Sequence, residues 1–167
     1  IVYGRRIGSG DMWLVNRVAA GAAYAYGNSS QVPYSEQFYA GGANSVRAFT
    51  VRSIGPGSYR APASQINGYF DQTGTFIFLA NTELRFPILG PLHGAVFLDA
   101  GNVWTLKNEE SRPGGQLRAS TFLRDLALGT GAGLRFNISM LIIRADLGIG
   151  IHAPYDTGKR GYYNMES

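Results

Sequence analysis

Three charged residues carry the chemistry that this sequence most strongly suggests, and two of them lie in strand-like, apolar surroundings. Asp99 follows the apolar run 95–98, and Glu83 lies within the Phe- and Leu-rich run 76–86. An unpaired carboxylate removed from water is very costly, so each acid needs a cation or solvent. Arg47 is a candidate partner because a guanidinium can donate hydrogen bonds to two carboxylates at once. The three residues predict an ion cluster that pins a long loop against a sheet.

A plainer interpretation of the same residues remains open. In that interpretation Arg47 is a solvated loop arginine, and the two acids pair with arginines that share their face of the sheet. The candidates for that pairing are Arg85, Arg135 and Arg144. The spacing of the residues does not by itself separate the two interpretations.

The sequence gives little support to catalysis or to a bound cofactor. His93 and His152 are far apart, and neither lies near a Gly-x-Ser-x-Gly turn or an acid at metal-ligand spacing. The alternating glycines of segment 129–133 lack the Lys-Ser/Thr ending of a phosphate-binding loop, and no helix follows them. We interpret them as small positions that allow close packing on a sheet. We therefore expect no enzyme, no metal site and no cofactor.

The composition favours many strands joined by turns. The 167 residues include 23 Gly, 10 Tyr and 9 Phe, and 16% of them are charged, below the usual level of about 25%. The absence of cysteine excludes disulfides and thiolate chemistry. The net charge of +4 comes from scattered arginines, without the Lys/Arg run typical of nucleic-acid binding, so we expect no nucleic-acid partner.

Alternation of apolar and polar residues predicts an all-β, antiparallel meander. Five strands are expected, at residues 12–26, 76–86, 93–104, 126–136 and 139–151, and residues 1–10 are interpreted as the end of an earlier element. One face of the sheet is apolar, and the other carries the charged side chains of Glu83, Arg85, Asp99, Arg135, Arg144 and Asp146. No apolar stretch of 18 residues exists, which excludes a membrane-spanning helix, whereas strands of about 9–11 residues with one apolar face can span a membrane.

The connections between these strands are of two kinds. Short turns at 87–91 and 137–138 alternate with long polar loops at 27–74 and 105–124. Tight turns at one end and long loops at the other are typical of outer-membrane barrels. A loop as long as 27–74 is more often functional than passive. A soluble sheet with one half-buried face remains the alternative.

Four motifs occur in a fixed order along the chain. They are Gly-Gly-x-x-Ser-Val-Arg-x-Phe (41–49), Glu-x-Arg-Phe-Pro (83–87), Phe-x-Asp-x-Gly-Asn-Val-Trp (97–104) and Gly-x-Gly-x-Gly-Leu-Arg (129–135). With these motifs the sequence resembles the bacterial surface antigen domain over roughly residues 11–151. That domain is the C-terminal β-barrel region of BamA- and TamA-type outer-membrane assembly and translocation proteins.

The resemblance implies a fold and a set of site residues. Residues 1–167 would form the C-terminal part of a transmembrane β-barrel, and loop 27–74 would fold back into its lumen. Arg47 would anchor the loop on Glu83 and Asp99. The residues beside the anchor would be Val46 and Phe49, and the structural glycines would be Gly41, Gly42 and Gly101.

The sequence departs from the family pattern at two places. The family usually has glycine where this chain has Ala48, and a glycine there would serve a special backbone angle. The family also closes with a last strand that ends in an aromatic residue, whereas this chain ends at 163–167. We therefore expect the final strand to be missing from this sequence.

The resemblance also implies a function and a location. The chain would be part of a non-enzymatic barrel of the bacterial outer membrane that inserts or translocates other proteins. Its partners would be outer-membrane lipid, substrate outer-membrane or secreted proteins, and accessory assembly lipoproteins. A two-partner-type secretion channel or a passive porin-like pore is the alternative, followed by a soluble ligand-binding β-domain.

Overall fold

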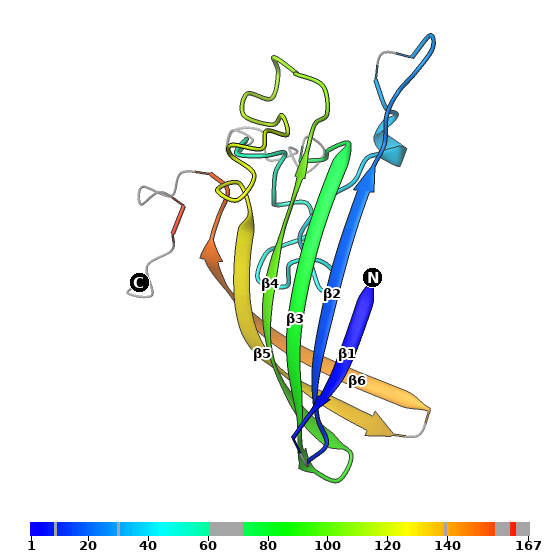
Figure 1. Cartoon of the computed structure of the whole chain (residues 1–167), viewed down its shortest axis with the longest axis vertical. Coiled ribbons are helices and arrows are strands. Elements are labelled where there is room, and N and C mark those ends of the chain that lie inside the picture. The colour runs from blue at the N-terminus through cyan, green and yellow to red at the C-terminus, as the bar shows by residue number, and fades with distance from the viewer. Residues whose placement is uncertain (9, 30, 61–71, 139, 156–160, 163–167) are drawn as a thin grey trace.

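The computed structural model describes residues 1–8, 10–29, 31–60, 72–138, 140–155 and 161–162. They form a six-stranded antiparallel sheet in which each strand pairs with the next along the chain (Figure 1). The strands are β1 (Val2–Ile7), β2 (Met12–Ala22), β3 (Phe76–Leu89), β4 (Leu92–Trp104), β5 (Ala127–Ile138) and β6 (Leu141–His152). Within those ranges the helical structure is the 3₁₀ turn η1 (Tyr34–Glu36), and no helix has the length and hydropathy needed to cross a membrane.

The predicted fold class is confirmed, and the strand boundaries need correction. Residues 1–10, interpreted as the end of an earlier element, contain the strand β1, which was not among the five expected strands and pairs with β2 along its length. β1 escapes a search for apolar alternation because it is short and exposed and its apolar residues do not alternate with polar ones. β2 ends at Ala22 rather than at residue 26, and the expected turn at 137–138 is instead the end of β5, where Asn137 pairs with Ile142.

The sheet has a polar face, and the pairing of its strands defines it. Asn81 of β3 lies opposite Asp99 of β4, and Asp99 lies opposite Gly129 of β5. Opposite residues point to the same side of a sheet, and the side alternates along each strand. We use the term polar face for the side that carries Arg17, Asn81, Glu83, Arg85, Asp99, Arg135, Arg144 and Asp146. The predicted sharing of one face by the charged strand residues is therefore confirmed.

The opposite, apolar face is uncovered. Among its large side chains Val96, Leu98 and Leu134 are 44–50% exposed, and Leu147 is 75% exposed. A continuous apolar surface of this kind marks a site of contact with another protein or with a membrane. The sheet thus has charged side chains on its covered face and apolar side chains on its open face. This arrangement is typical of a barrel strand whose open face contacts lipid.

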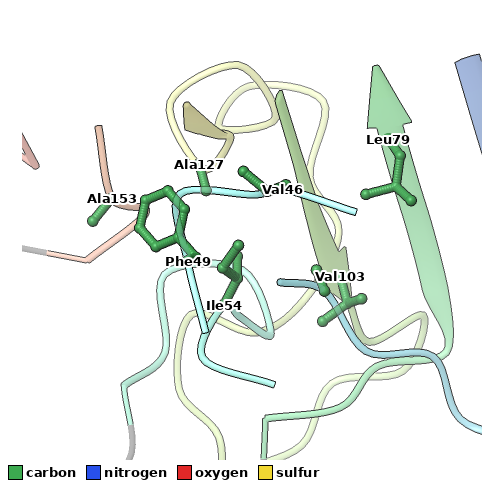
Figure 2. Packing of buried hydrophobic residues seen from close by; sticks show 8 residues of the cluster. Val46, Phe49, Ile54, Leu79, Val103, Ala127 and Ala153 are labelled. Carbon is green, nitrogen blue, oxygen red and sulfur yellow. The ribbon is translucent and has the colours of Figure 1, made fainter. Parts of the chain in front are cut away.

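The connection between β2 and β3 covers the polar face. Figure 1 shows its described part, in cyan, packed against the sheet, with the short hairpin turns at one end of the strands and the long connections at the other. A buried apolar cluster lies between loop and sheet (Figure 2). Its members are Ala40, Val46, Phe49 and Ile54 from the loop, and Leu79, Val103, Ala127 and Ala153 from the strands and the segment after β6. Part of the predicted loop 27–74 and the chain end at 163–167 lie outside the described residues.

Candidate functional site

Two successive turns build the loop tip, which we define as residues 42–49. Ser45 N donates to the carbonyl of Gly42 over 3.0 Å, Phe49 N donates to Val46 over 3.1 Å, and Gly42 N closes the tip on the carbonyl of Phe49 over 2.8 Å. Gly41 and Gly42 have φ of 103° and 90°, which L-residues with a side chain rarely adopt. A Cβ on Gly41 would also lie 2.0 Å from the carbonyl oxygen of Thr50. The Gly-Gly pair therefore serves the backbone path into the tip.

Arg47 projects from the tip onto the polar face and contacts both acids. Its Nε donates to Asp99 Oδ2 over 2.8 Å, its Nη2 donates to Asp99 Oδ1 over 2.9 Å, and its Nη1 donates to Glu83. The three side chains are almost fully buried, with 8% of Arg47, none of Asp99 and 9% of Glu83 exposed. The interpretation of Arg47 as a solvated loop arginine is therefore wrong.

The surroundings keep Arg47 charged. Burial by itself lowers the pKa of Arg47, but the hydrogen bonds to Asp99 and Glu83 outweigh that effect, and the pKa of Arg47 is raised above its ordinary value. The guanidinium carbon also lies 3.6 Å from the centroid of the Phe97 ring, a cation–π contact. Phe97 in turn covers Gly131, where a Cβ would lie 2.5 Å from Phe97 Cζ. The interpretation of this glycine as a small packing position is confirmed.

The acids have further partners on the polar face. Glu83 accepts hydrogen bonds from Arg85 Nε over 2.7 Å and from Arg135 Nη2 over 3.0 Å. Arg135 also pairs with Asp146, whose Oδ2 forms an ion pair with Arg144 Nε at 3.2 Å and lies 3.9 Å from Arg47 Nη1. The site is thus a connected network rather than a triplet, and each of its charges has an opposite neighbour.

The plainer interpretation names Arg85 and Arg135 as partners of the acids, and their contacts with Glu83 confirm that part of it. Sequence reasoning places Asp146 on the correct face but does not assign it to the site. The sequence signal for Arg135 and Asp146 is a charged residue at a polar-face position of each of two adjacent strands, β5 and β6. The pairing itself depends on the register of β5 and β6, in which Gly133 lies opposite Asp146. A register shift of one residue would move Asp146 to the apolar face.

Polar side chains from three strands also hold the tip backbone. Asn81 Nδ2 donates to the carbonyl of Ser45 over 2.7 Å and to Asp99 Oδ1 over 2.9 Å. Arg17 Nη1 donates to the carbonyl of Asn44 over 2.7 Å, and Arg144 Nη2 donates to that of Ala43 over 3.1 Å. These three hydrogen bonds tie the backbone of the tip to the sheet. Asn81 and Arg17 were not among the predicted site residues, because a lone polar residue in a strand carries no distinctive pattern.

The residues on either side of Arg47 anchor the tip by apolar contact. Val46 is fully buried and Phe49 is 9% exposed, and Figure 2 shows both in the cluster with Leu79 and Val103. Gly101 leaves room for this packing. A Cβ there would lie 2.6 Å from Leu79 Cδ2 and 3.2 Å from Val46 Cγ2.

The second half of the 97–104 motif joins the long loops at the end of β4. Asn102 Nδ2 donates to the carbonyl of Gly57 over 2.9 Å and also to that of Asp125. Trp104 is fully buried and stacks on Phe122, with 5.0 Å between ring centroids. This part of the motif has a structural role next to the ion network.

The described residues contain no group of three or more histidine or acidic side chains arranged to hold a metal ion. His152 Nδ1 lies 2.8 Å from the carbonyl oxygen of Leu126, which ties the end of β6 to the segment before β5. His93 lies near the turn between β3 and β4. The chemistry that the site supports is the binding of one chain segment by another.

Comparison with known proteins gives two findings. The family model of the Omp85 superfamily domain matches residues 6–164. Over 129 residues the chain is 30% identical to the outer membrane protein assembly factor BamA of Neisseria meningitidis serogroup B (strain ATCC BAA-335 / MC58). That alignment covers 66% of this chain and 16% of the relative, so the chain spans a small part of the relative's length.

Proposed function

Since the chain belongs to the Omp85 superfamily and lies in the bacterial outer membrane, we propose that it is part of a barrel that assembles other proteins into that membrane or moves them across it. The relative's name, outer membrane protein assembly factor, supports the assembly side of this proposal. The substrates would be outer-membrane or secreted proteins, and accessory assembly lipoproteins would be further partners. The activity would be non-enzymatic and would use no cofactor.

In this proposal residues 1–167 form the C-terminal part of the barrel wall. The apolar face, with Leu98, Leu134 and Leu147 exposed, would contact outer-membrane lipid. The polar face would line the lumen, and the loop between β2 and β3 would lie inside it. Other parts of the full protein would pair with the edges formed by β1 and β6, because lipid cannot satisfy unpaired strand edges.

The docked tip would act as a brace for the wall. The observation that carries this proposal is the two-point contact of Arg47 with Asp99 of β4, combined with its bond to Glu83 of β3. One guanidinium thereby joins two adjacent strands in a single register. A braced wall would keep its shape while substrate segments pass beside it, and a barrel without the brace would hold its loop and its register less firmly.

A passive porin-like pore is the competing function. It needs an open lumen, whereas the tip is packed on the polar face with Val46 fully buried. Planar-bilayer conductance separates the two functions. A large, steady conductance of the full-length protein would favour the passive pore, and a small or irregular conductance would favour the assembly or translocation barrel.

The decisive experiment replaces Arg47 in the full-length protein. We expect Arg47→Ala to slow the appearance of folded outer-membrane proteins in cells and to make the loop sensitive to protease. Arg118→Ala is the matched control, because Arg118 is an exposed arginine of another long loop. Wild-type assembly rates and an equally resistant loop in Arg47→Ala cells would refute the brace.

A further inference from the structure

Ala48, the residue after Arg47, lies against two glycines of neighbouring strands. A Cβ built on Gly129 of β5 would lie 2.5 Å from Ala48 Cβ. A Cβ built on Gly148 of β6 would lie 2.9 Å from Ala48 Cα, 3.0 Å from Ala48 N and 3.1 Å from the carbonyl carbon of Arg47. Real Cβ atoms do not approach other heavy atoms so closely, so the tip occupies space that exists because both positions lack a side chain.

Conformation does not explain these glycines. Neither Gly129 nor Gly148 has a positive φ, and both lie inside strands, where glycine weakens the sheet. Glycine inside a strand commonly marks the close approach of another backbone. Ala48 also has no positive φ, so the tip of this chain does not need the backbone freedom of glycine at this position.

The two glycines come together only in one pairing of their strands. Gly129 lies opposite Gly150, and Gly148 lies opposite Gly131, so the space for Ala48 spans β5 and β6. β5 pairs with β4 along its other edge, where Gly129 lies opposite Asp99, the main partner of Arg47. Consecutive tip residues therefore lie on different strands: Arg47 donates hydrogen bonds to β3 and β4, and Ala48 packs on β5 and β6.

We propose that Gly129 and Gly148 form a seat for Ala48, which we call the glycine seat, and that the tip docks only when β5 and β6 are paired in the observed register. Gly129, Gly148 and Ala48 are thus positioning residues for the docked loop. The inference rests on the proposed function and adds a condition to it: the loop responds to the pairing of four strands, not of two. A shift of β6 by one residue would turn Gly148 away and place a larger side chain under the tip.

The test measures tryptic cleavage after Arg47 in the full-length protein in outer-membrane vesicles, by mass spectrometry of the released fragments. This bond is protected in the docked tip, and its cleavage rate reports the population of the undocked tip. Gly129→Ala should speed cleavage by about tenfold or more, since the new methyl group overlaps Ala48 Cβ. Ala48→Val should have the same effect from the loop side, with the strands unchanged.

A rescue experiment makes the test specific. The double variant Gly129→Ala/Ala48→Gly should be cleaved within about twofold of Ala48→Gly alone, because the overlapping methyl of Ala48 is gone. Gly148→Ala should not be rescued by Ala48→Gly, because its Cβ would meet backbone atoms of the tip. Gly4→Ala is the matched control, a glycine on the same face of β1 whose Cβ would meet only Trp13 Cε3 at 3.9 Å.

The results separate the seat from the brace. Unchanged cleavage in Gly129→Ala or Ala48→Val, or failure of Ala48→Gly to restore protection, would overturn the glycine seat. If the seat variants stay protected at Arg47 while Arg47→Ala slows assembly and exposes the loop to a protease that does not cleave at arginine, the seat fails and the proposed function stands. If the seat variants open the tip while assembly keeps its wild-type rate, the seat stands and the brace fails.

Discussion

Asp99 accepts three hydrogen bonds from Arg47, a residue 52 positions earlier in the chain. The donors are the backbone N–H, Nε and Nη2 of Arg47, at 3.0, 2.8 and 2.9 Å. The carboxylate is fully buried, so a single side chain of β4 fixes both the position and the orientation of the loop tip. Bidentate pairs of this kind are geometrically specific as well as strong.

Replacement of Asp99 should therefore undock the tip more than replacement of Asp146, the more distant acid of the network. Asp99→Asn keeps the shape but removes the charge, and we expect docking to weaken by about 2–3 kcal/mol. Cleavage after Arg47 in vesicles measures this effect. Asp146→Asn should weaken docking less, because Asp146 is 3.9 Å from Arg47 Nη1 and is partly exposed. Equal effects of the two substitutions would contradict this ranking.

Arg47→Lys tests geometry against charge. Lysine keeps the positive charge, but it cannot donate to both oxygens of Asp99 and to Glu83 in the fork arrangement of arginine. We expect Arg47→Lys to lie much closer to Arg47→Ala than to the wild type in rates of outer-membrane protein assembly. An Arg47→Lys protein with wild-type activity would mean that charge alone holds the tip.

Docking should not change between about pH 7 and pH 10, as far as Arg47 is concerned. The pKa of Arg47 is raised by Asp99 and Glu83 against the opposing effect of burial. A group with a raised pKa in the folded state gives its full stabilisation below its ordinary pKa and loses it only when the pH rises through the folded-state value. For arginine the stabilisation is therefore lost only above pH 12, outside the tested range. Protease protection of the tip, measured with a protease active across the range, should stay flat.

Gly101→Ala should destabilise the packing between loop and sheet. The added methyl would lie 2.6 Å from Leu79 Cδ2 and 2.9 Å from the carbonyl oxygen of Phe78, and overpacking of this kind costs about 1–3 kcal/mol. The loss of stability is measured by heating the protein before gel electrophoresis. The readout is the temperature above which the protein no longer migrates as its folded form. Gly10→Ala, where a Cβ meets nothing within 4 Å, should leave that temperature unchanged.

A lysine on the apolar face tests the orientation of the sheet. Leu147 is 75% exposed on that face, and Leu147→Lys should impair membrane insertion, since a lysine facing lipid costs about 2–4 kcal/mol near the midplane. Val15→Lys is the control, because Val15 lies opposite Glu83 and shares the polar face. The yield of folded, membrane-extracted protein is the readout. Equal yields from the two variants would mean that the apolar face does not contact lipid.

The sequence allowed the central contacts to be predicted because their residues are anomalous. A carboxylate such as Asp99 in an apolar strand requires a partner, and Arg47 lies in a motif that a family resemblance makes recognisable. The two further members, Arg135 and Asp146, are charged residues on a charged face, and only the register of β5 and β6 shows that they meet.

The missed strand and the glycine seat have a common cause. β1 is short, exposed and at an edge, and its apolar residues do not alternate with polar ones, so its sequence does not predict a strand. Gly129 and Gly148 are 19 positions apart, and neither is adjacent in sequence to Ala48. Periodicity predicts which side a residue faces, whereas contacts between a loop and a sheet depend on three-dimensional packing.

The distance in sequence between Arg47 and its partners also sets an order of events. The loop tip is made before β3, β4 and β6 in the chain, yet it contacts residues of all three. Contacts with large separation in sequence carry an entropic cost of loop closure, so we expect docking of the tip to follow the pairing of these strands. Before docking, the carboxylates of the polar face would be hydrated, and docking of the tip would replace that water with the hydrogen bonds of Arg47.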